Sequence, residues 1–306
     1  MPRAKLILQP VNPALPTPAI EDWSPAPSGT ERCLAGFLHV MDIDARAAAA
    51  HGNAFSRLRD GSLQAIVVHE ACPPGLLPAL VERLERHDPP FLKTWFPPAF
   101  HAWFYGRNIN LADGGLAGYF DEAARFNAQL DELMPVGAPL PVSVGRLLSA
   151  LDSGRSFVAA PGPQPGQRYM FTTLRAHVEQ GYIPAHFDNE MRLRPSYRHL
   201  ARVVEPHILS FVLAFSEAES GGALEVFDLR CDPDEARLLS DDHVRDKPDT
   251  AVLASVRLRL PPGSLIVLDS GRYLHRVTRV GGGRTRWTAC SFMARSRAGD
   301  EMFCWG

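Results

Sequence analysis

The stretch Gly181-Tyr-Ile-Pro-Ala-His186-Phe-Asp188-Asn-Glu190 carries a His-x-Asp pair where a strand is expected to end. Side chains alternate along a strand, so His186 and Asp188 are predicted to lie on the same side. An imidazole beside a carboxylate suits a borderline divalent metal ion. On its own the pair is a weak signal, because His-x-Asp occurs by chance in many chains and a structural pair is the simpler interpretation.

A second histidine, His275, follows 89 residues later and strengthens the metal interpretation. Two histidines and one carboxylate on one face of a metal form the facial triad of non-haem Fe(II) oxygenases, which leaves positions for a cosubstrate and O₂. Arg284 and Arg286 come 9 and 11 residues after His275, behind the Gly281-Gly-Gly283 turn. A planar guanidinium binds a carboxylate through two parallel hydrogen bonds, so either arginine is a candidate for the distal carboxylate of a cosubstrate.

Strand-like runs dominate the sequence around these residues. Turn signals rich in glycine and proline separate several of the runs, which favours an antiparallel sandwich or jelly roll. The runs cover residues 169–177, 207–215, 223–228, 250–260, 264–268, 274–280 and 284–294. Apolar residues at helical spacing predict helices over 76–87, 114–133 and 143–151.

We therefore expect an α+β, mainly β fold, with a double-stranded β-helix (jelly-roll) core braced by N-terminal helices. The predicted organisation is a single domain over 1–306. Within it, 1–60 is expected to form an irregular, proline-rich arm, 61–160 a helical support and 161–306 the jelly-roll core. The polar insertion at 230–249 interrupts the strand series, and loops at the mouths of barrels often act as lids.

Composition excludes several functional classes. The chain has 306 residues, with 32 Lys and Arg against 34 Asp and Glu, which argues against nucleic-acid binding by bulk positive charge. The longest apolar run, Ile208–Phe215, is too short to span a bilayer. Five scattered cysteines without a Cys-x-x-Cys motif indicate a reduced, cytoplasmic protein. We expect neither a nucleic-acid nor a membrane partner, and the sequence does not indicate an oligomeric state.

Three more motifs follow the His-x-Asp pair in order. They are Gly221-Gly-Ala-Leu224, Pro262-Gly-Ser-Leu265 and His275-Arg-Val-Thr-Arg-Val-Gly-Gly-Gly283 with its two arginines. Together the four motifs resemble the Fe(II)/2-oxoglutarate-dependent dioxygenases, in the prolyl-hydroxylase-like branch that includes small-molecule hydroxylases. The resemblance covers roughly residues 168–294.

The resemblance implies a set of site residues. His186, Asp188 and His275 would hold Fe(II). The far carboxylate of 2-oxoglutarate would bind an arginine, and Arg286 is favoured over Arg284 because many members carry a hydroxyl residue two positions later. That residue here is Thr288. A tyrosine that often contacts the cosubstrate is replaced by His177, a weak candidate for the same role.

The resemblance also implies the reaction. Such an enzyme would use Fe(II), 2-oxoglutarate and O₂ to hydroxylate an unactivated C–H bond of a small molecule, such as an amino acid derivative or natural product, releasing succinate and CO₂. No catalytic residue beyond the iron ligands is expected. Halogenating members typically have glycine or alanine where this chain has Asp188, so hydroxylation is predicted rather than chlorination.

Other outcomes remain open at this point. Desaturation and ring formation use the same iron ligands, a cupin-like metal-dependent hydrolase or isomerase would share the fold, and a sensing module could keep the fold without turnover. Substrate contacts are only weakly indicated. They are Arg175, Tyr169, Asn189 and Glu190, which lie on or beside the predicted metal strand.

Overall fold

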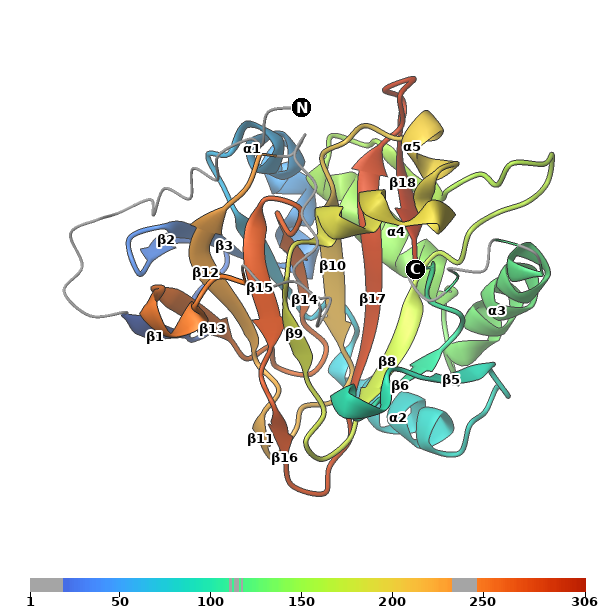
Figure 1. The fold of residues 1–306 in the computed structure, drawn as a ribbon, viewed down its shortest axis with the longest axis horizontal. Coiled ribbons are helices and arrows are strands. Elements are labelled where there is room, and N and C mark those ends of the chain that lie inside the picture. Colours follow the sequence, from blue (N-terminus) through green and yellow to red (C-terminus); the bar gives the residue numbers. More distant parts are fainter. Residues whose placement is uncertain (1–18, 110–111, 113–115, 117, 233–246) are drawn as a thin grey trace.

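The structure is a computed structural model that describes residues 19–109, 112, 116, 118–232 and 247–306. Its largest element is an 11-stranded sheet (Figure 1). The main path of this sheet runs in the order β2 (Thr30–Leu34), β3 (Leu38–Asp44), β4 (Ala65–His69), β14 (Leu265–Leu268), β10 (Leu209–Ala214), β17 (Arg286–Arg295), β8 (Thr173–His177), β6 (Ala102–Tyr105) and β5 (Lys93–Trp95). Off this path, β18 (Glu301–Trp305) pairs with the end of β17, and β7 (Ser156–Ala159) pairs in parallel with β18.

A second sheet of five strands carries the metal-binding motif. Its order is β1 (Ile20–Trp23), β13 (Ser255–Leu258), β12 (Leu224–Arg230), β15 (Tyr273–Val277) and β9 (Ile183–His186). A short ribbon, β11 (Ser220–Gly221) with β16 (Val280–Gly281), extends from its lower end (Figure 1).

The two sheets pack face to face through a shared apolar cluster. Val67 and Ile266 come from the large sheet, and Val226 and Val256 come from the small one. All four side chains are fully buried. Two facing sheets of mainly antiparallel strands form the predicted jelly roll, and the fold class is confirmed.

Helices cover the other face of the large sheet, as predicted. They are α1 (Ala54–Asp60), α2 (Leu77–Glu85), α3 (Tyr119–Leu133) and α4 (Leu140–Leu151), with a short α5 (Leu200–Val203). The face of α3 predicted to be apolar is buried, including Phe126 and Leu130, because the large sheet supplies a matching apolar surface. Figure 1 shows α2 and α3 at the lower right, beyond β8 and β6. Short 3₁₀ turns connect the elements: η1 (Ala45–His51), η2 (Pro74–Leu76), η3 (Pro98–Phe100), η5 (Asp188–Leu193), η6 (Pro195–Tyr197) and η7 (Thr250–Val252).

The prediction of an irregular arm over 1–60 is wrong for residues 20–60. Strands β1, β2 and β3 and the helical segments η1 and α1 lie there. The reason is a non-local pairing: Val40 and Ile43 of β3 are fully buried, and β3 pairs in parallel with β4. The expected helical support at 61–160 likewise contains β4 to β7 beside its helices.

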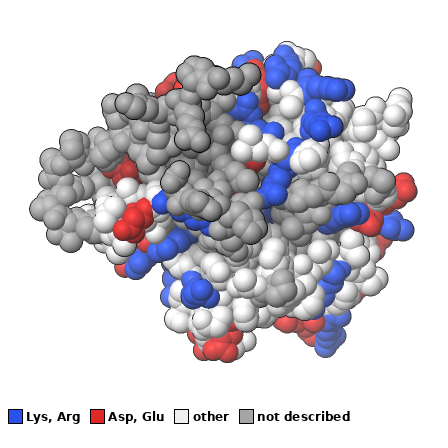
Figure 2. All heavy atoms as spheres, viewed as in Figure 1, with Lys and Arg blue, Asp and Glu red and all other residues white. Residues whose placement is uncertain are grey.

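Two other expectations fall largely outside the described residues. Residues 1–18 of the predicted arm and 233–246 of the 230–249 insertion are not described, so the lid hypothesis for that insertion stays a prediction. The single-domain organisation also stays a prediction. Among the described helices, none is long and apolar enough to cross a membrane. Figure 2 shows acidic and basic side chains both present among the described residues of one face.

Candidate metal centre

Three predicted ligands meet between the two sheets. His186 ends β9, and its cross-strand partner on β15 is His275. Asp188 begins η5 immediately after β9. Its Oδ1 lies 3.3 Å from His186 Nε2 and 3.7 Å from His275 Nε2. One ligand atom from each of the three residues can be chosen so that all lie within 4.8 Å of one another, which is close enough to hold one metal ion.

Backbone carbonyls orient both imidazoles. The ring Nδ1 of His186 lies 2.8 Å from the carbonyl oxygen of Pro184, and that of His275 lies 3.0 Å from the carbonyl oxygen of Tyr273. A carbonyl only accepts, so each Nδ1 must carry the proton and donate it. Each Nε2 then faces Asp188 and is the ring nitrogen that would bind a metal ion.

The electrostatics of the triad also suit a cation. Burial, followed by the neighbouring His186, lowers the pKa of His275 to about 4, so this imidazole is neutral at pH 7. Burial pushes the pKa of Asp188 upward, but His275 and the hydrogen bond from His186 hold it well below its usual range. Burial also acts to lower the pKa of His186, yet its hydrogen bond to Asp188 raises it. Two imidazoles and an ionised carboxylate fit Fe(II).

A buried cation lies in the same cavity. Arg286 begins β17, directly opposite His177 on β8, and both line the cavity with the triad. Arg286 is 7% exposed, and no hydrogen bond or ion pair joins its guanidinium to any residue the structure describes. Burial lowers its pKa to about 10, which leaves it charged at neutral pH. An unpaired buried charge is costly, so this guanidinium is suited to an anionic ligand such as a carboxylate.

His177 and Arg175 lie on the face of β8 that lines the cavity. Both ring nitrogens of His177 are buried without a hydrogen-bond partner among the described residues. Burial, then Arg286 and Arg175, lower the pKa of His177 well below its ordinary value, so it is neutral. The guanidinium of Arg175 lies over the ring of Phe104, 5.1 Å from its centre, and Arg175 also lines the cavity.

In the glycine pair before β12, steric contact explains why Gly222 is a glycine, and the sequence did not reveal this contact. Gly222 has φ +67°, and a Cβ atom there would lie 2.8 Å from Cδ of Arg286. Only glycine gives the Arg286 side chain this space. Gly222 therefore helps to set the position of the buried guanidinium.

Three other residues that were predicted for the site are not among those that line the cavity. Arg284 is exposed, precedes β17 and is not among the residues lining the cavity. Thr288 is fully buried on β17, with its Oγ1 3.6 Å from Sγ of Cys290. Tyr169 does not line the cavity but packs in the core against Tyr119 and Phe120 of α3.

Asn189 and Glu190 are buried and support the turn after the metal carboxylate. The Asn189 side chain donates to Sγ of Cys231 at 3.3 Å. The Glu190 carboxylate accepts from the backbone N–H of Phe187 at 3.3 Å. Neither residue is among those lining the cavity. In the structure both hold η5, and with it Asp188, in place.

The apolar lining of the cavity was missed by sequence reasoning. It comes from alternate positions of several strands, and inward alternation along those strands was the available signal. The lining includes Phe211, Val212, Leu224, Ile266, Leu268 and Phe292.

Comparison with known proteins gives one family match and several structural ones. A family model described as the carrier-protein-independent halogenase WelO5 matches residues 37–306. No curated protein matches the chain. A solved N-substituted L-amino acid dioxygenase from Burkholderia ambifaria AMMD is 22% identical, covers 83% of this chain and 91% of its own, and has a TM-score of 0.53. Its complex with alpha-KG gives 19% identity, coverages of 83% and 90%, and a TM-score of 0.52. At these identities the solved structures show a shared fold.

Proposed function

The chain belongs to the Fe(II)/2-oxoglutarate oxygenases, in the family of the halogenase WelO5, and from this premise we propose that it hydroxylates an unactivated C–H bond of a free-standing small molecule. The iron is assigned to His186, Asp188 and His275. When bound, Fe(II) with 2-oxoglutarate and O₂ supplies the oxidation, with release of succinate and CO₂.

One observation favours hydroxylation over halogenation: Asp188 occupies the third ligand position. Its carboxylate oxygen lies within 3.7 Å of both imidazole Nε2 atoms, so the three residues together would hold the metal ion. A halide needs a metal position that no protein carboxylate fills. The family name is that of a halogenase, and Asp188 is the residue that argues for a different outcome in this chain.

The remaining roles follow from charge and burial. Arg286 supplies a fixed positive charge for the far carboxylate of 2-oxoglutarate, with His177 beside it as a neutral hydrogen-bonding partner. Thr288 is buried two positions later on the same strand, and its hydroxyl is our candidate for a second contact with the same carboxylate. The apolar side chains around the triad exclude water and would face a mainly apolar part of the substrate.

The substrate is expected to be a small molecule that is not tethered to a carrier protein. The name of the family model includes independence from a carrier protein, which supports this choice. Near-balanced total charge agrees with it, since 32 basic residues face 34 acidic ones. Arg175 lines the cavity and is our candidate contact for an acidic or polar group of the substrate.

The test uses purified protein with Fe(II), 2-oxoglutarate, O₂ and chloride, and a panel of free-standing amino acid derivatives and natural-product precursors. Mass spectrometry distinguishes the outcomes. Gain of one oxygen atom supports the proposal, whereas gain of chlorine in place of hydrogen contradicts it. Loss of two hydrogens would indicate desaturation or ring formation on the same site.

A further inference from the structure

A broad basic groove lies on the opposite face of the metal-binding sheet. Along β15, His275 points into the cavity between the sheets, so its neighbour Arg276 points to the outer face. Along β12, Leu224 lines the cavity and Glu225 points outward in the same way. The groove on this outer face has a volume of about 940 Å³. The described strands therefore have one site on each face, and Ile183 and Val277 line both of them.

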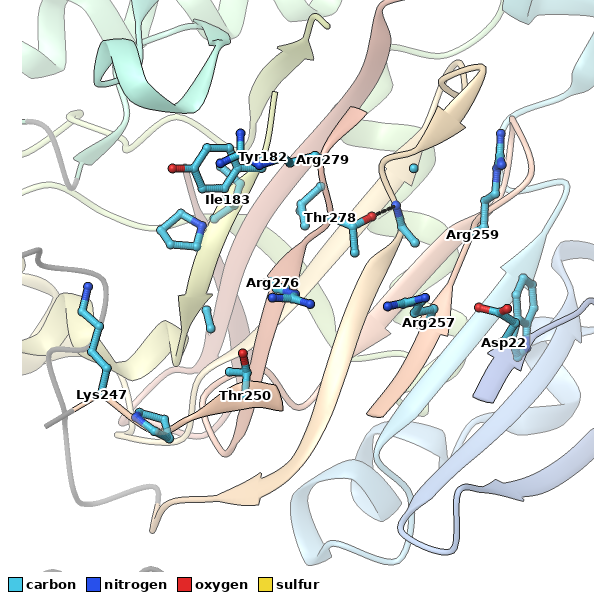
Figure 3. Close-up of a pocket in the computed structure, with 17 residues that line it drawn as sticks. Asp22, Tyr182, Ile183, Lys247, Thr250, Arg257, Arg259, Arg276, Thr278 and Arg279 are labelled. Carbon is cyan, nitrogen blue, oxygen red and sulfur yellow. Dashed lines mark hydrogen bonds between the residues drawn. The ribbon is translucent and has the colours of Figure 1, made fainter. Parts of the chain in front are cut away.

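Basic side chains dominate the lining of the groove (Figure 3). Asp22 is the one carboxylate among the lining residues that the structure describes. The basic members are Lys247, Arg257, Arg259, Arg276 and Arg279. Glu217 pairs with Arg259 at 3.6 Å, so the positive charge that can attract an anion to this concave surface lies mainly on Arg257, Arg276 and Arg279.

One buried carboxylate organises the centre of the groove. Glu225 is 1% exposed, and its two oxygens accept from Nε of Arg257 at 3.1 Å and Nε of Arg276 at 2.6 Å. Ser255 Oγ also donates to it, at 2.9 Å. Figure 3 shows the two guanidinium groups turned toward each other across β12.

This arrangement leaves the outer edges of both guanidinium groups available. Each uses its Nε for Glu225, and the Nη atoms of Arg257 and Arg276 make no hydrogen bond with the residues that the structure describes. Both side chains are more than one third exposed. Two oriented guanidinium groups, held by one negative charge, keep a net positive charge and several donors for a second anion.

A third arginine stands over an aromatic ring at the side of the groove. The guanidinium of Arg279 lies 4.1 Å from the ring centre of Tyr182. No ion pair joins Arg279 to a residue that the structure describes. Its guanidinium donates one long hydrogen bond, of 3.4 Å, to the carbonyl oxygen of Gln180. This pair offers a charge and a flat apolar surface close together (Figure 3).

We propose that this groove binds a small molecule carrying a phosphate group, in a site separate from the iron. A phosphate has more acceptor oxygens than a carboxylate, in a tetrahedral arrangement and with up to two negative charges, so it can accept hydrogen bonds from the Nη groups of Arg257 and Arg276 at once. The volume leaves room for an organic part of the ligand beside Tyr182.

The experiment is calorimetric titration of the Fe(II)- and 2-oxoglutarate-loaded protein, without O₂, with phenyl phosphate. Phthalate, a dianion that carries only carboxylates, is titrated in parallel. We expect saturable phenyl phosphate binding that weakens with salt, and weaker phthalate binding. Arg257→Gln and Arg276→Gln are each expected to raise the Kd about tenfold or more, because each removes charge-assisted hydrogen bonds. Arg279→Gln breaks no ion pair and tests the site without disturbing Glu225.

Two controls make the result decisive. Arg86→Gln removes an exposed arginine of the segment after α2, outside the groove, and should bind phenyl phosphate like the wild type. Wild-type protein without Fe(II) and 2-oxoglutarate should also bind phenyl phosphate as the loaded protein does, because the residues of the metal centre line the other face of the sheet. No saturable binding to the wild type, equal affinity for phthalate, an equal loss in Arg86→Gln, or loss of binding when Fe(II) and 2-oxoglutarate are left out would each overturn the proposal.

Discussion

His186 and His275 are cross-strand partners on β9 and β15, with ring centres 4.4 Å apart, although 89 residues separate them in the chain. The register of these two strands brings both Nε2 atoms to the same oxygen of Asp188. The candidate metal centre therefore depends on one strand pairing, and it is complete only when the jelly roll has formed.

Single replacement of each ligand should abolish metal-dependent turnover. We expect His186→Ala, Asp188→Ala and His275→Ala to weaken Fe(II) binding by more than the ~10–100-fold that loss of an outer-shell partner costs. The measurements are anaerobic Fe(II) titration and succinate formation. His51→Ala is the control, since His51 lies on η1 and is not among the residues lining the cavity. Full Fe(II) affinity in any of the three variants would remove that residue from the metal set.

Chloride should not compete for the iron of the wild type. Asp188 fills the third protein position, so added chloride is expected to leave both the rate and the oxygenated product unchanged apart from a general salt effect. Sulfate at matched ionic strength is the control. Asp188→Gly opens this position, and the variant should lose oxygenation. A chlorinated product from the wild type would show that Asp188 does not stay on the metal.

Arg286 and Arg284 should behave differently. Arg286 is buried in the cavity and Arg284 is exposed outside it. A hydrogen bond to a charged group contributes about 1.5–3 kcal/mol, so Arg286→Gln should raise KM for 2-oxoglutarate about 10- to 100-fold. Arg286→Lys should recover only part of this, because an ammonium cannot form two parallel hydrogen bonds. Arg284→Gln should leave KM nearly unchanged, and the reverse pattern would transfer the role to Arg284.

Gly222→Ala should act through Arg286. The new Cβ would lie 2.8 Å from Cδ of Arg286, at a backbone φ of +67°. Overpacking of this kind costs about 1–3 kcal/mol, so we expect lower stability together with a higher KM for 2-oxoglutarate. Gly166→Ala is the matched control, because Gly166 also has a positive φ, of +80°, and nothing lies within 4 Å of a Cβ there. A change in stability without any change in KM would mean that Gly222 does not position Arg286.

His177 should make the metal-free protein less stable in acid. Its pKa in the folded protein is well below the ordinary value of 6.5, because of burial and then Arg286 and Arg175. Below that ordinary value the unfolded chain binds a proton that the folded protein does not, so the free energy of unfolding falls as the pH falls. Above it this contribution is constant. The loss is at most about 1.4 kcal/mol per pH unit.

Denaturant unfolding of metal-free wild type and His177→Gln isolates this contribution. The other histidines are the same in both proteins, so the difference between the two curves reports His177. The wild type should lose more stability than the variant between neutral pH and about pH 5. Parallel pH profiles for the two proteins would contradict a neutral, buried His177.

The sequence predicted the strands around the metal centre because their signals are local. Each predicted strand run from 169 to 294 overlaps an observed strand. His275 lies in such a run, and the His-x-Asp pair was expected at the end of a strand, where period-two alternation predicts that His186 and Asp188 lie on the same side. The buried face of α3 was predictable for the same reason, because its apolar residues recur at helical spacing.

What the sequence did not predict depends on distant pairing. Strand β7 pairs in parallel with β18, whose residues lie more than 140 positions later, and β3 joins the large sheet through β4. The choice between Arg284 and Arg286 also needed the structure, since residues two positions apart on a strand point to the same face. Ser216 Oγ donates to the carbonyl oxygen of Thr285 at 2.8 Å, and β17 begins only at Arg286.

The most direct test of the central claim is turnover under ¹⁸O₂ with Fe(II), 2-oxoglutarate and chloride, using the panel of free-standing small molecules. Our account predicts succinate that carries one ¹⁸O atom and a product with one added ¹⁸O atom and no chlorine, both lost in His186→Ala. A chlorinated product, or ¹⁸O-labelled succinate formed equally well by His186→Ala, would contradict it.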